Sequence, residues 1–242
     1  MVQRSFVETL MMFSLTRQEA AIYQCLLGEG KTTGYEVAKQ LGISRSNAYN
    51  SLASLTEKGG AYLAYEGKTK KYAPVKIDEF CKNHLRHLEE AKSWLVKHAP
   101  DEKQETEGYI TIEGEVNILD KMKNLLLETT ERAYISCNRS FLLNFIGELE
   151  ILKAQHKKVV IITDQPVNMP HFKIYYGEDR KTSVGLIVDS RFVMTGEYGE
   201  GGDNTCLYSG QKYFVDLYKK ALANEIKLLA LKEGKKDEKD IY

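Results

Sequence analysis

The sequence predicts a multidomain α+β protein with a helical N-terminal unit, a linker helix and a C-terminal α/β unit built on a mixed sheet. Apolar residues recur at helical spacing through roughly the first hundred positions. The polar run "APDEKQETEG", residues 99–108, then marks a boundary. Beyond it, strand-like apolar runs alternate with helical stretches, as in an α/β domain. The predicted segments are 1–75 for the helical unit, 76–100 for the linker helix, 106–232 for the sheet unit and 233–242 for a charged tail.

The composition indicates a folded chain with one locally basic region. The 242 residues have 43% hydrophobic content and zero formal net charge, which argues against disorder and against an evenly basic nucleic-acid binder. From Lys31 to Lys76, however, the sequence has eight basic residues and only three acidic ones. This local excess of positive charge favours a polyanionic partner.

Cysteine usage and the N-terminal stretch predict a cytoplasmic protein. The four cysteines form no CxxC pair, so reduced thiols are expected. "MVQRSFVETLMMFSL" lacks a long apolar core and a cleavage site, so neither a signal peptide nor a membrane span is predicted. Cys81, His84 and His87 are spaced three apart on the linker helix, so adjacent members can share a metal ion. The outer two are separated by about 240° around the helix, so one helix cannot offer all three to one ion. We predict no metal, no cofactor and no membrane partner.

The N-terminal unit has the element order of a helix-turn-helix. Helices are expected at about 2–13, from Thr16 to near Gly28 and Gly30, at about 33–40, and from Ser44 to Gly59. Thr16 and Glu19, within "TRQE", form a capping box. Gly42 ends the third helix and Ser44 caps the fourth. Two helices joined by a short turn that contains Gly have the spacing of a helix-turn-helix.

The segment "AYLAYEGKTKKYAPV", residues 61–75, predicts a β-hairpin with its turn at Gly67. A hairpin in this place is a wing, so the unit is predicted to be a winged helix-turn-helix. Lys68, Lys70 and Lys71 lie at the tip or just past it. They would add salt-sensitive affinity for a phosphate backbone that does not depend on base sequence.

The fourth helix is predicted to present a polar face outward. With Ala48 set inward, Leu52 and Leu55 fall on the same side of the helix. The outward positions and their flanks are Ser46, Asn47, Tyr49, Asn50, Ala53 and Ser54. Small amide and hydroxyl side chains can read base edges in a major groove, and Asn suits adenine. Arg45, in the first turn, can reach a guanine or a phosphate.

Double-stranded DNA is therefore the predicted partner. Thr32, Thr33 and the amino end of the third helix suit backbone phosphates. The predicted DNA-contacting residues are Thr32, Thr33, Arg45, Ser46, Asn47, Tyr49, Asn50, Lys68, Lys70 and Lys71. A polar outer face and scattered lysines also occur on ordinary small helical domains, but the order of cap, helix, Gly turn, capped helix and basic hairpin favours DNA.

The first hundred residues resemble the TrmB family of transcriptional regulators. "LTRQEAAIYQCLL" resembles that family's opening "LT-x-x-E-A-x-x-Y-x-x-L", and "EGKTKKYAPV" resembles its wing. "GYEVAKQLGISRSNAYNSLASLTEKG" resembles its "EIA…GVPRS-x-VY-x-x-L-x-x-LE-x-G". Ser44 replaces a frequent Pro, and Gly60 replaces an apolar residue, which we expect to loosen the first wing strand. The resemblance implies a winged helix, a dimerising helix and a sensor domain.

The linker helix, from Lys76 to His98, has a seam at alternating spacings of four and three residues over about three heptads. The seam positions are Ile77, Cys81, His84, Leu88, Ala91, Leu95 and His98. This pattern predicts a homodimer. The seam histidines either make dimer packing pH-sensitive or are merely tolerated there.

The C-terminal unit is predicted to have strands separated by helices. The strand-like runs are "GYITIE", "RAYISC", "KVVIIT", "FKIYYG", "VGLIVD", "RFVMTG" and "NTCLYS", and helices are expected at about 115–128, 140–155 and 211–231. "IEGEVNILDKMKNLLLETTERAYIS" resembles the start of the TrmB C-terminal domain, which is similar to one half of a phospholipase D fold.

A near match to the phospholipase D signature HxK-x4-D occurs in "HFKIYYGED", residues 171–179. The phrase "LIVDSRFVMTGE", however, resembles the enzymes' "V-V-D-G-R-x-A-L-V-G-S", which makes Asp189 the equivalent Asp. Counting back from it, the His position is Thr182 and the Lys position is Val184. Thr has no base beside it in this register, and Val supplies no positive charge, so we predict that the chain is not an enzyme.

A non-catalytic α/β unit can still bind a ligand beyond the carboxyl ends of its strands. "ISCNRS" and "ITDQP" place polar residues there, which suit an anion or a sugar. The predicted effector-binding residues are Asn138, Arg139, Asp164, His171 and Asp189. Ordinary loop and capping polarity is the alternative explanation.

The predicted function is that of a dimeric, sequence-specific DNA-binding transcriptional regulator with a non-catalytic, phospholipase D-like C-terminal domain for effector sensing or dimerisation. A phosphodiesterase or nuclease carrying a DNA-targeting winged helix is one alternative. An architectural DNA-binding protein, whose second domain only dimerises, is the other.

Overall fold

The computed structural model describes residues 5–100, 108–201 and 203–232. The chain divides into two compact units, Met1–Glu102 and Lys103–Tyr242, and each is described by itself. The predicted charged tail, the first residues of the first predicted helix and most of the predicted polar boundary lie outside the described residues. The finer division into four segments stays a prediction.

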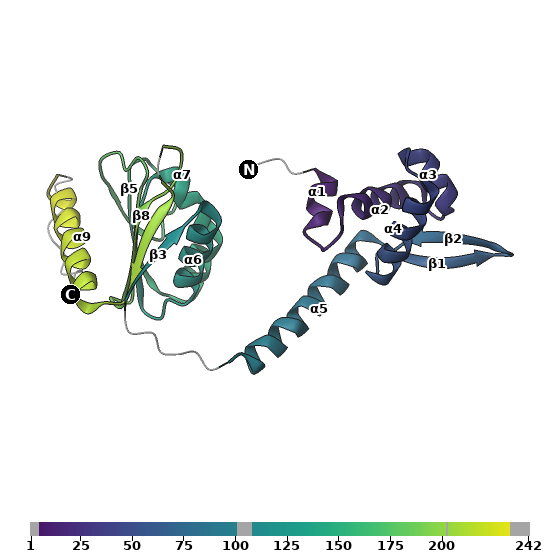
Figure 1. Cartoon of the computed structure of the whole chain (residues 1–242). Helices are drawn as coiled ribbons and strands as arrows, with labels where there is room; N and C mark the ends of the chain where they lie inside the picture. Colours follow the sequence, from purple (N-terminus) through teal and green to yellow (C-terminus); the bar gives the residue numbers. More distant parts are fainter. Residues whose placement is uncertain (1–4, 101–107, 202, 233–242) are drawn as a thin grey trace. The chain divides into compact units, whose positions relative to one another are not determined.

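The helices of the first unit are α1 (Phe6–Met11), α2 (Arg17–Glu29), α3 (Gly34–Leu41) and α4 (Arg45–Glu57) (Figure 1). Each is preceded by a capping residue whose side chain accepts a hydrogen bond from a backbone N–H of the first turn. These caps are Ser5, Thr16, Thr33 and Ser44. These caps satisfy backbone N–H groups that a helix start leaves without partners. Gly42 ends α3 in the left-handed conformation, as the predicted turn requires.

The predicted wing is present as β1 (Ala61–Glu66) and β2 (Thr69–Pro74), which pair antiparallel. Gly67, in the turn, has a φ of 59°, a value that favours glycine. The expected loosening at Gly60 is wrong. A Cβ there would lie 2.4 Å from Leu55 Cδ1, so the glycine lets the wing begin directly against α4.

The linker helix α5 (Ile77–His98) begins inside the first unit's core and then leaves it. Phe80 is buried, and its ring lies 5.1 Å from that of Tyr23. The ring of His84 lies 5.6 Å from that of Phe13. Past this point Leu88 and the residues that follow it on α5 are exposed. The predicted seam is therefore divided, because its first part packs within its own chain.

In the described residues, the second unit contains a seven-stranded sheet of order β3-β9-β8-β7-β4-β5-β6. The strands are β3 (Tyr109–Glu113), β4 (Arg132–Ser136), β5 (Lys158–Thr163), β6 (Lys173–Tyr176), β7 (Ser183–Val188), β8 (Phe192–Glu197) and β9 (Thr205–Ser209). The strands β4, β5 and β6 are parallel to one another, and the other pairs are antiparallel. The predicted mixed sheet, and with it the predicted α+β class, is confirmed.

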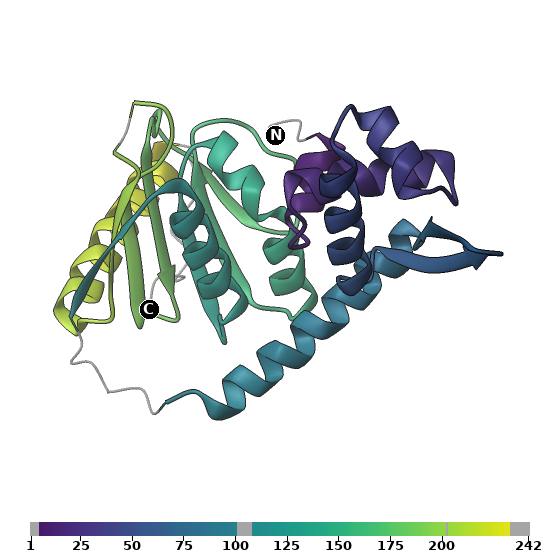
Figure 2. The ribbon, with the colours of Figure 1, turned by 45° about the vertical axis from the view of Figure 1, so that its right-hand side comes forward.

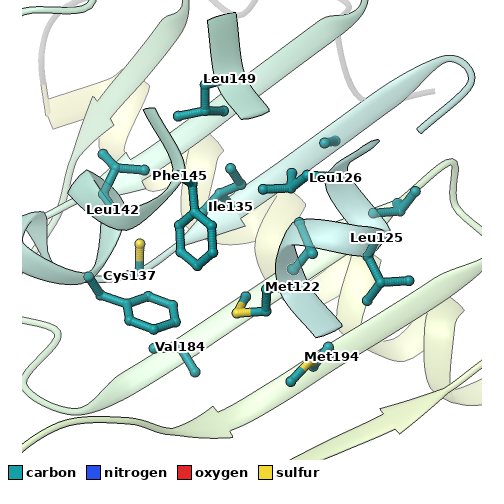
Figure 3. Packing of buried hydrophobic residues seen from close by; sticks show 14 of the residues in the cluster. Met122, Leu125, Leu126, Ile135, Cys137, Leu142, Phe145, Leu149, Val184 and Met194 are labelled. Atoms are coloured by element: carbon teal, nitrogen blue, oxygen red, sulfur yellow. The ribbon is translucent and has the colours of Figure 1, made fainter. Parts of the chain in front are cut away.

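Helices cover both faces of this sheet, as Figures 1 and 2 show. One face carries α6 (Glu115–Leu127), α7 (Arg139–Leu142) and α8 (Ile146–Ala154), and their apolar residues form the core in Figure 3. The other face carries α9 (Lys212–Lys232). A Cβ on Gly185 would lie 1.9 Å from the Tyr218 hydroxyl, so the glycine in β7 permits α9 to approach closely.

The single helix predicted at 140–155 is wrong, because a 3-10 turn at Leu143–Phe145 interrupts it. Phe145 has a φ of −114°, outside the helical range, and is fully buried. Its ring lies 5.0 Å from that of Phe141 at 75°, an edge-to-face arrangement. The interruption places both rings in one core (Figure 3 labels Phe145).

Candidate nucleic-acid interface and candidate effector pocket

The helix α4 has the predicted division into an apolar and a polar face. Ala48, Leu52 and Leu55 are fully buried. The residues predicted to meet DNA from this helix are all exposed: Arg45, Ser46, Asn47, Tyr49 and Asn50. A helix held by one apolar stripe thus leaves a continuous polar surface that can enter a major groove.

Ser54 does not belong to this outward surface, contrary to the sequence prediction. Its hydroxyl donates a 2.7 Å hydrogen bond to Glu19 Oε1, and Lys58 Nζ lies 2.7 Å from Glu19 Oε2. Burial alone would raise the pKa of Glu19, but these partners and the Thr16 amide lower it to about 2. The carboxylate therefore fastens α4 to α2 and fixes the orientation of the exposed face.

Thr32 and Thr33 have internal partners at the amino end of α3. The Thr32 hydroxyl and the Thr33 amide donate to Glu36 Oε2 at 2.7 and 2.8 Å. The hydrogen bond from the Thr33 backbone is the main cause that lowers the pKa of Glu36 to about 2. Thr32 is also buried and pairs through its backbone with Tyr72 of the wing. A carboxylate thus occupies the helix end that was predicted to suit a phosphate.

Arg45 lies beside an aromatic side chain that the sequence did not single out. Its guanidinium carbon is 4.3 Å from the centroid of the exposed Tyr35 ring on α3. Tyr49 packs over the start of the same helix, because a Cβ on Gly34 would lie 2.6 Å from its ring. Both contacts join α3 to α4 at the predicted DNA face.

The wing lysines differ in their surroundings. Lys68 is exposed at the tip. Lys70 Nζ lies 5.3 Å from the centroid of the Tyr72 ring. Lys71 Nζ is 2.6 Å from Glu66 Oε2, and Lys31 pairs with the other oxygen of the same carboxylate. These two ion pairs, Lys31 first, lower the pKa of Glu66 to about 2, so part of the wing's positive charge is neutralised locally.

In the second unit, a hollow of about 280 Å³ lies beyond the carboxyl ends of β4 and β5. Its lining residues are Asn138, Arg139, Ser140, Leu143, Asp164, Gln165, Asp179 and Lys181. Asn138 Oδ1 caps α7 by accepting from the Phe141 amide at 2.8 Å, and Asp164 accepts from the Arg139 amide at 3.0 Å. The hollow therefore combines amide and hydroxyl groups with two cationic side chains, Arg139 and Lys181, and two carboxylates, Asp164 and Asp179.

The other two predicted effector residues lie elsewhere. The strand β7 runs antiparallel to β4, so Asp189, just after it, lies at the opposite edge of the sheet from Asn138. Its carboxylate accepts from the Thr130 hydroxyl and from the amides of Thr130, Glu131 and Arg132 at 2.8–2.9 Å. Burial would raise the pKa of Asp189, but these hydrogen bonds lower it. The geometry gives Asp189 a structural role.

His171 lies in the turn before β6. Because β6 is parallel to β5, this turn is at the opposite edge from Asp164, which follows β5. Lys173 Nζ lies 5.7 Å from the centroid of the Tyr175 ring. The five predicted effector residues therefore do not form one site, and only Asn138, Arg139 and Asp164 are brought together.

The two positions that the sequence resemblance aligned with the phospholipase D signature are Thr182 and Val184. Val184 is buried in the core, as Figure 3 shows, and cannot face a substrate. Thr182 accepts a hydrogen bond from the Tyr198 amide through its backbone carbonyl. In the part of the chain that the structure describes, no group of three or more His, Cys, Asp or Glu residues is arranged to hold a metal ion. No described helix has the length and apolar character to cross a membrane.

A helix-turn-helix whose second helix is polar outward, followed by a basic wing and joined to an α/β unit, defines a DNA-binding regulator of the winged-helix class. Residues 10–78 match the model of the family described as "Sugar-specific transcriptional regulator TrmB". The first unit of the chain is thus similar to the TrmB family of transcriptional regulators over its helix-turn-helix and wing.

Two relatives match over much of the chain. The uncharacterized protein YrhO of Bacillus subtilis (strain 168) is 26% identical over 197 residues, which cover 80% of this chain and 70% of that protein. The sugar sensing transcriptional regulator TrmBL1 of Pyrococcus furiosus is 26% identical over 171 residues, 68% of this chain. The match spans 49% of TrmBL1, about half its length.

Solved structures with similar arrangements are more distant. TrmBL2, described as an archaeal chromatin protein, has a TM-score of 0.43 at 20% identity and covers 92% of this chain and 97% of its own. NucT from Helicobacter pylori has a TM-score of 0.40 at 11% identity, over 50% of this chain and 97% of its own.

Proposed function

We propose that this regulator is a cytoplasmic homodimer that reads a specific DNA sequence with α4 and responds to an effector bound in its second unit. The observation that carries the proposal is the continuous exposed polar face of α4, held in place by a buried apolar stripe. The match of residues 10–78 to the TrmB family model supports DNA binding and regulation, while sequence specificity, dimerisation and effector sensing are proposals.

In the proposed complex, α4 lies in the major groove. Asn50 hydrogen-bonds an adenine, and Ser46 and Asn47 contact neighbouring base edges or sugar-phosphate groups. Tyr49 lines the entry of the groove, and the wing lysines Lys68, Lys70 and Lys71 contact phosphates. Thr32 and Thr33 act indirectly, since their hydroxyls hold Glu36 and thereby the start of α3.

The exposed half of α5 supports the proposed dimer. Leu85, Leu88, Trp94, Leu95 and Val96 are each more than half exposed on this helix. Of these, Leu85, Leu88 and Leu95 recur at helical spacing on an otherwise polar helix, which is typical of a surface that packs on another helix. Two copies joined there would present two α4 helices to half-sites of a palindromic operator.

The hollow at the carboxyl edge of β4 and β5 supports effector binding. Its charged and amide groups suit hydroxyl or anionic groups of a small ligand such as a sugar phosphate. Lys181, Asp179 and Arg180 belong to the segment between β6 and β7, and Arg180 pairs with Glu225 of α9. A ligand in the hollow would therefore contact a segment linked to the C-terminal helix. If this contact differs between two conformations of the chain, ligand binding shifts the equilibrium between them.

The experiment that tests the function is footprinting of the full chain on DNA upstream of candidate genes. We expect a discrete protected site that disappears with Asn50→Ala. The control is Asn224→Ala, the same change on an exposed face of α9, which leaves the footprint intact. Coverage without a boundary would support an architectural role instead, and metal-independent cleavage of the probe would support an enzyme.

A further inference from the structure

Arg45 and Tyr35 meet on the surface of the first unit although they lie on different helices. Arg45 is the first residue of α4, and Tyr35 is in the first turn of α3. The guanidinium carbon is 4.3 Å from the ring centroid, and Tyr35 is 48% exposed. Among the described residues, the ion pairs within 4.0 Å do not include Arg45. The ring is therefore the feature that orients this cation.

Fold stability does not account for this contact. Both side chains are exposed, and a cation–π pair on an open surface contributes little to folding. Its larger effect is on Arg45 itself, since a free Arg side chain has many rotamers and a stacked one has few. Stacking uses the flat face of the guanidinium and leaves the in-plane N–H groups available for a planar acceptor pair.

The platform under Arg45 is held firmly. The capping box of Thr33 and Glu36 fixes the start of α3. The Tyr49 ring of α4 lies so close to Gly34 that a Cβ there would be 2.6 Å from it. Tyr35 is the next residue along the chain, so its backbone is fixed relative to α4. A fixed ring can hold the guanidinium in one place before DNA arrives, which reduces the entropy lost on binding.

We propose that Tyr35 is a positioning residue for Arg45 and that Arg45 reads a guanine through its N7 and O6 atoms. Residues at the amino end of a recognition helix contact base edges, and a bidentate Arg matches this acceptor pair. A phosphate also offers paired acceptors, but a phosphate contact weakens all sequences alike when it is lost. The inference rests on the proposed DNA-reading function and names the base that one residue recognises.

The test uses the full chain and a duplex selected by it from a random-sequence library. Affinity is measured for that duplex and for copies in which one guanine at a time is replaced by 7-deazaguanine, which lacks the N7 acceptor. The variants are Tyr35→Leu, Tyr35→Phe as the matched control that keeps a ring, Arg45→Ala, and Tyr35→Leu combined with Arg45→Ala. Circular dichroism and thermal unfolding verify that each variant is folded.

For the wild-type chain we expect one 7-deazaguanine position that lowers affinity by about 5- to 100-fold. Tyr35→Leu lowers affinity for the unmodified duplex by about 3- to 10-fold and reduces the effect of 7-deazaguanine, whereas Tyr35→Phe behaves as wild type. In the Arg45→Ala background, Tyr35→Leu has no further effect.

Three results would overturn the inference. Equal losses from Tyr35→Leu with and without Arg45 would show that the ring acts independently. Sensitivity to 7-deazaguanine that survives Arg45→Ala would show that another residue reads the guanine. A loss of affinity in Arg45→Ala that is equal for all duplexes would show that Arg45 contacts a phosphate. If the wild-type chain selects no sequence at all, the proposed function fails and this inference fails with it.

Discussion

At the scale of single residues, carboxylates organise the N-terminal unit. Glu19 fastens α4 to α2, Glu36 closes the amino end of α3, and Glu66 joins Lys31 to Lys71 at the wing. Hydrogen bonds and nearby positive charges outweigh desolvation and lower the pKa of each carboxyl to about 2, so each stays ionised well below neutral pH. Glu66 thus partly neutralises the basic wing that we propose to meet DNA.

Removing the carboxylate charge of Glu66 is expected to strengthen non-specific DNA binding. In Glu66→Gln, Lys31 and Lys71 lose their partner and become available to phosphates. The slope of log affinity against log salt concentration should become steeper by up to about two, because each freed lysine that binds a phosphate releases about one counterion. Fluorescence anisotropy with a random-sequence duplex at several salt concentrations measures this. Glu150→Gln, which releases Lys153 in the second unit, is the control, and an unchanged slope in Glu66→Gln would contradict the account.

Glu19→Gln is expected to destabilise the first unit by about 1–3 kcal/mol at pH 7, because it weakens partly buried charged hydrogen bonds. The folded pKa is lower than the unfolded one, so the carboxylate's stabilisation is complete above about pH 4.5 and is lost as pH falls towards 2. Hydrogen exchange of α2 and α4 amides at pH 7 and at pH 3 measures it. The difference between wild type and variant should shrink at pH 3, and a constant difference would argue against the ionised pair.

At the scale of elements, capping and turn residues were sufficient to predict most of the N-terminal unit. Thr16, Gly42 and Ser44 act through neighbours three to five residues away, so their roles are visible in the sequence. The "TGYE" stretch carries the same capping-box pattern, which is the local signal for the Thr33–Glu36 pair. The break at Leu143–Phe145 has no local signal, because it depends on how Phe145 fits the core.

Two glycines in the N-terminal unit should respond oppositely to a methyl group. Gly60→Ala is expected to destabilise the unit by about 1–3 kcal/mol, because the new Cβ would meet Leu55 at 2.4 Å. Gly28→Ala, within α2, meets nothing within 4 Å and is expected to stabilise it by about 0.5–1 kcal/mol. Amide hydrogen exchange in α2 and α4 measures both changes. Equal effects of the two substitutions would contradict the packing described at the base of the wing.

The candidate site was only partly visible from sequence for a related reason. The outward face of α4 follows from helical periodicity, and burial confirms it. The contact of Arg45 with Tyr35 and the network around Glu66 depend on how α3, α4 and the wing pack, so spacing alone did not reveal them. In the second unit, strand direction separates Asp189 and His171 from Asn138. The direction of a strand follows from the order and pairing of the whole sheet, which apolar periodicity alone does not predict.

At the scale of the whole molecule, we propose that two copies of the chain form a dimer through α5. The double variant Leu88→Glu with Leu95→Glu places charges in the exposed half of the α5 seam and is expected to give monomers. Sedimentation of the full chain over a range of concentrations measures the change. Leu127→Glu, an exposed leucine of α6, is the control. A double variant that sediments as a dimer would place the interface elsewhere.

We propose that the exposed face of α4 reads DNA sequence. The ratio of the dissociation constants for a selected and a scrambled duplex measures this property directly. Affinity of the full chain is compared between a duplex selected from random sequences and a scrambled duplex of equal length, at one fixed salt concentration. We predict a preference of about a thousandfold or more for the selected duplex, reduced at least about tenfold by Asn50→Ala. Equal affinity of the wild-type chain for the two duplexes would contradict the claim.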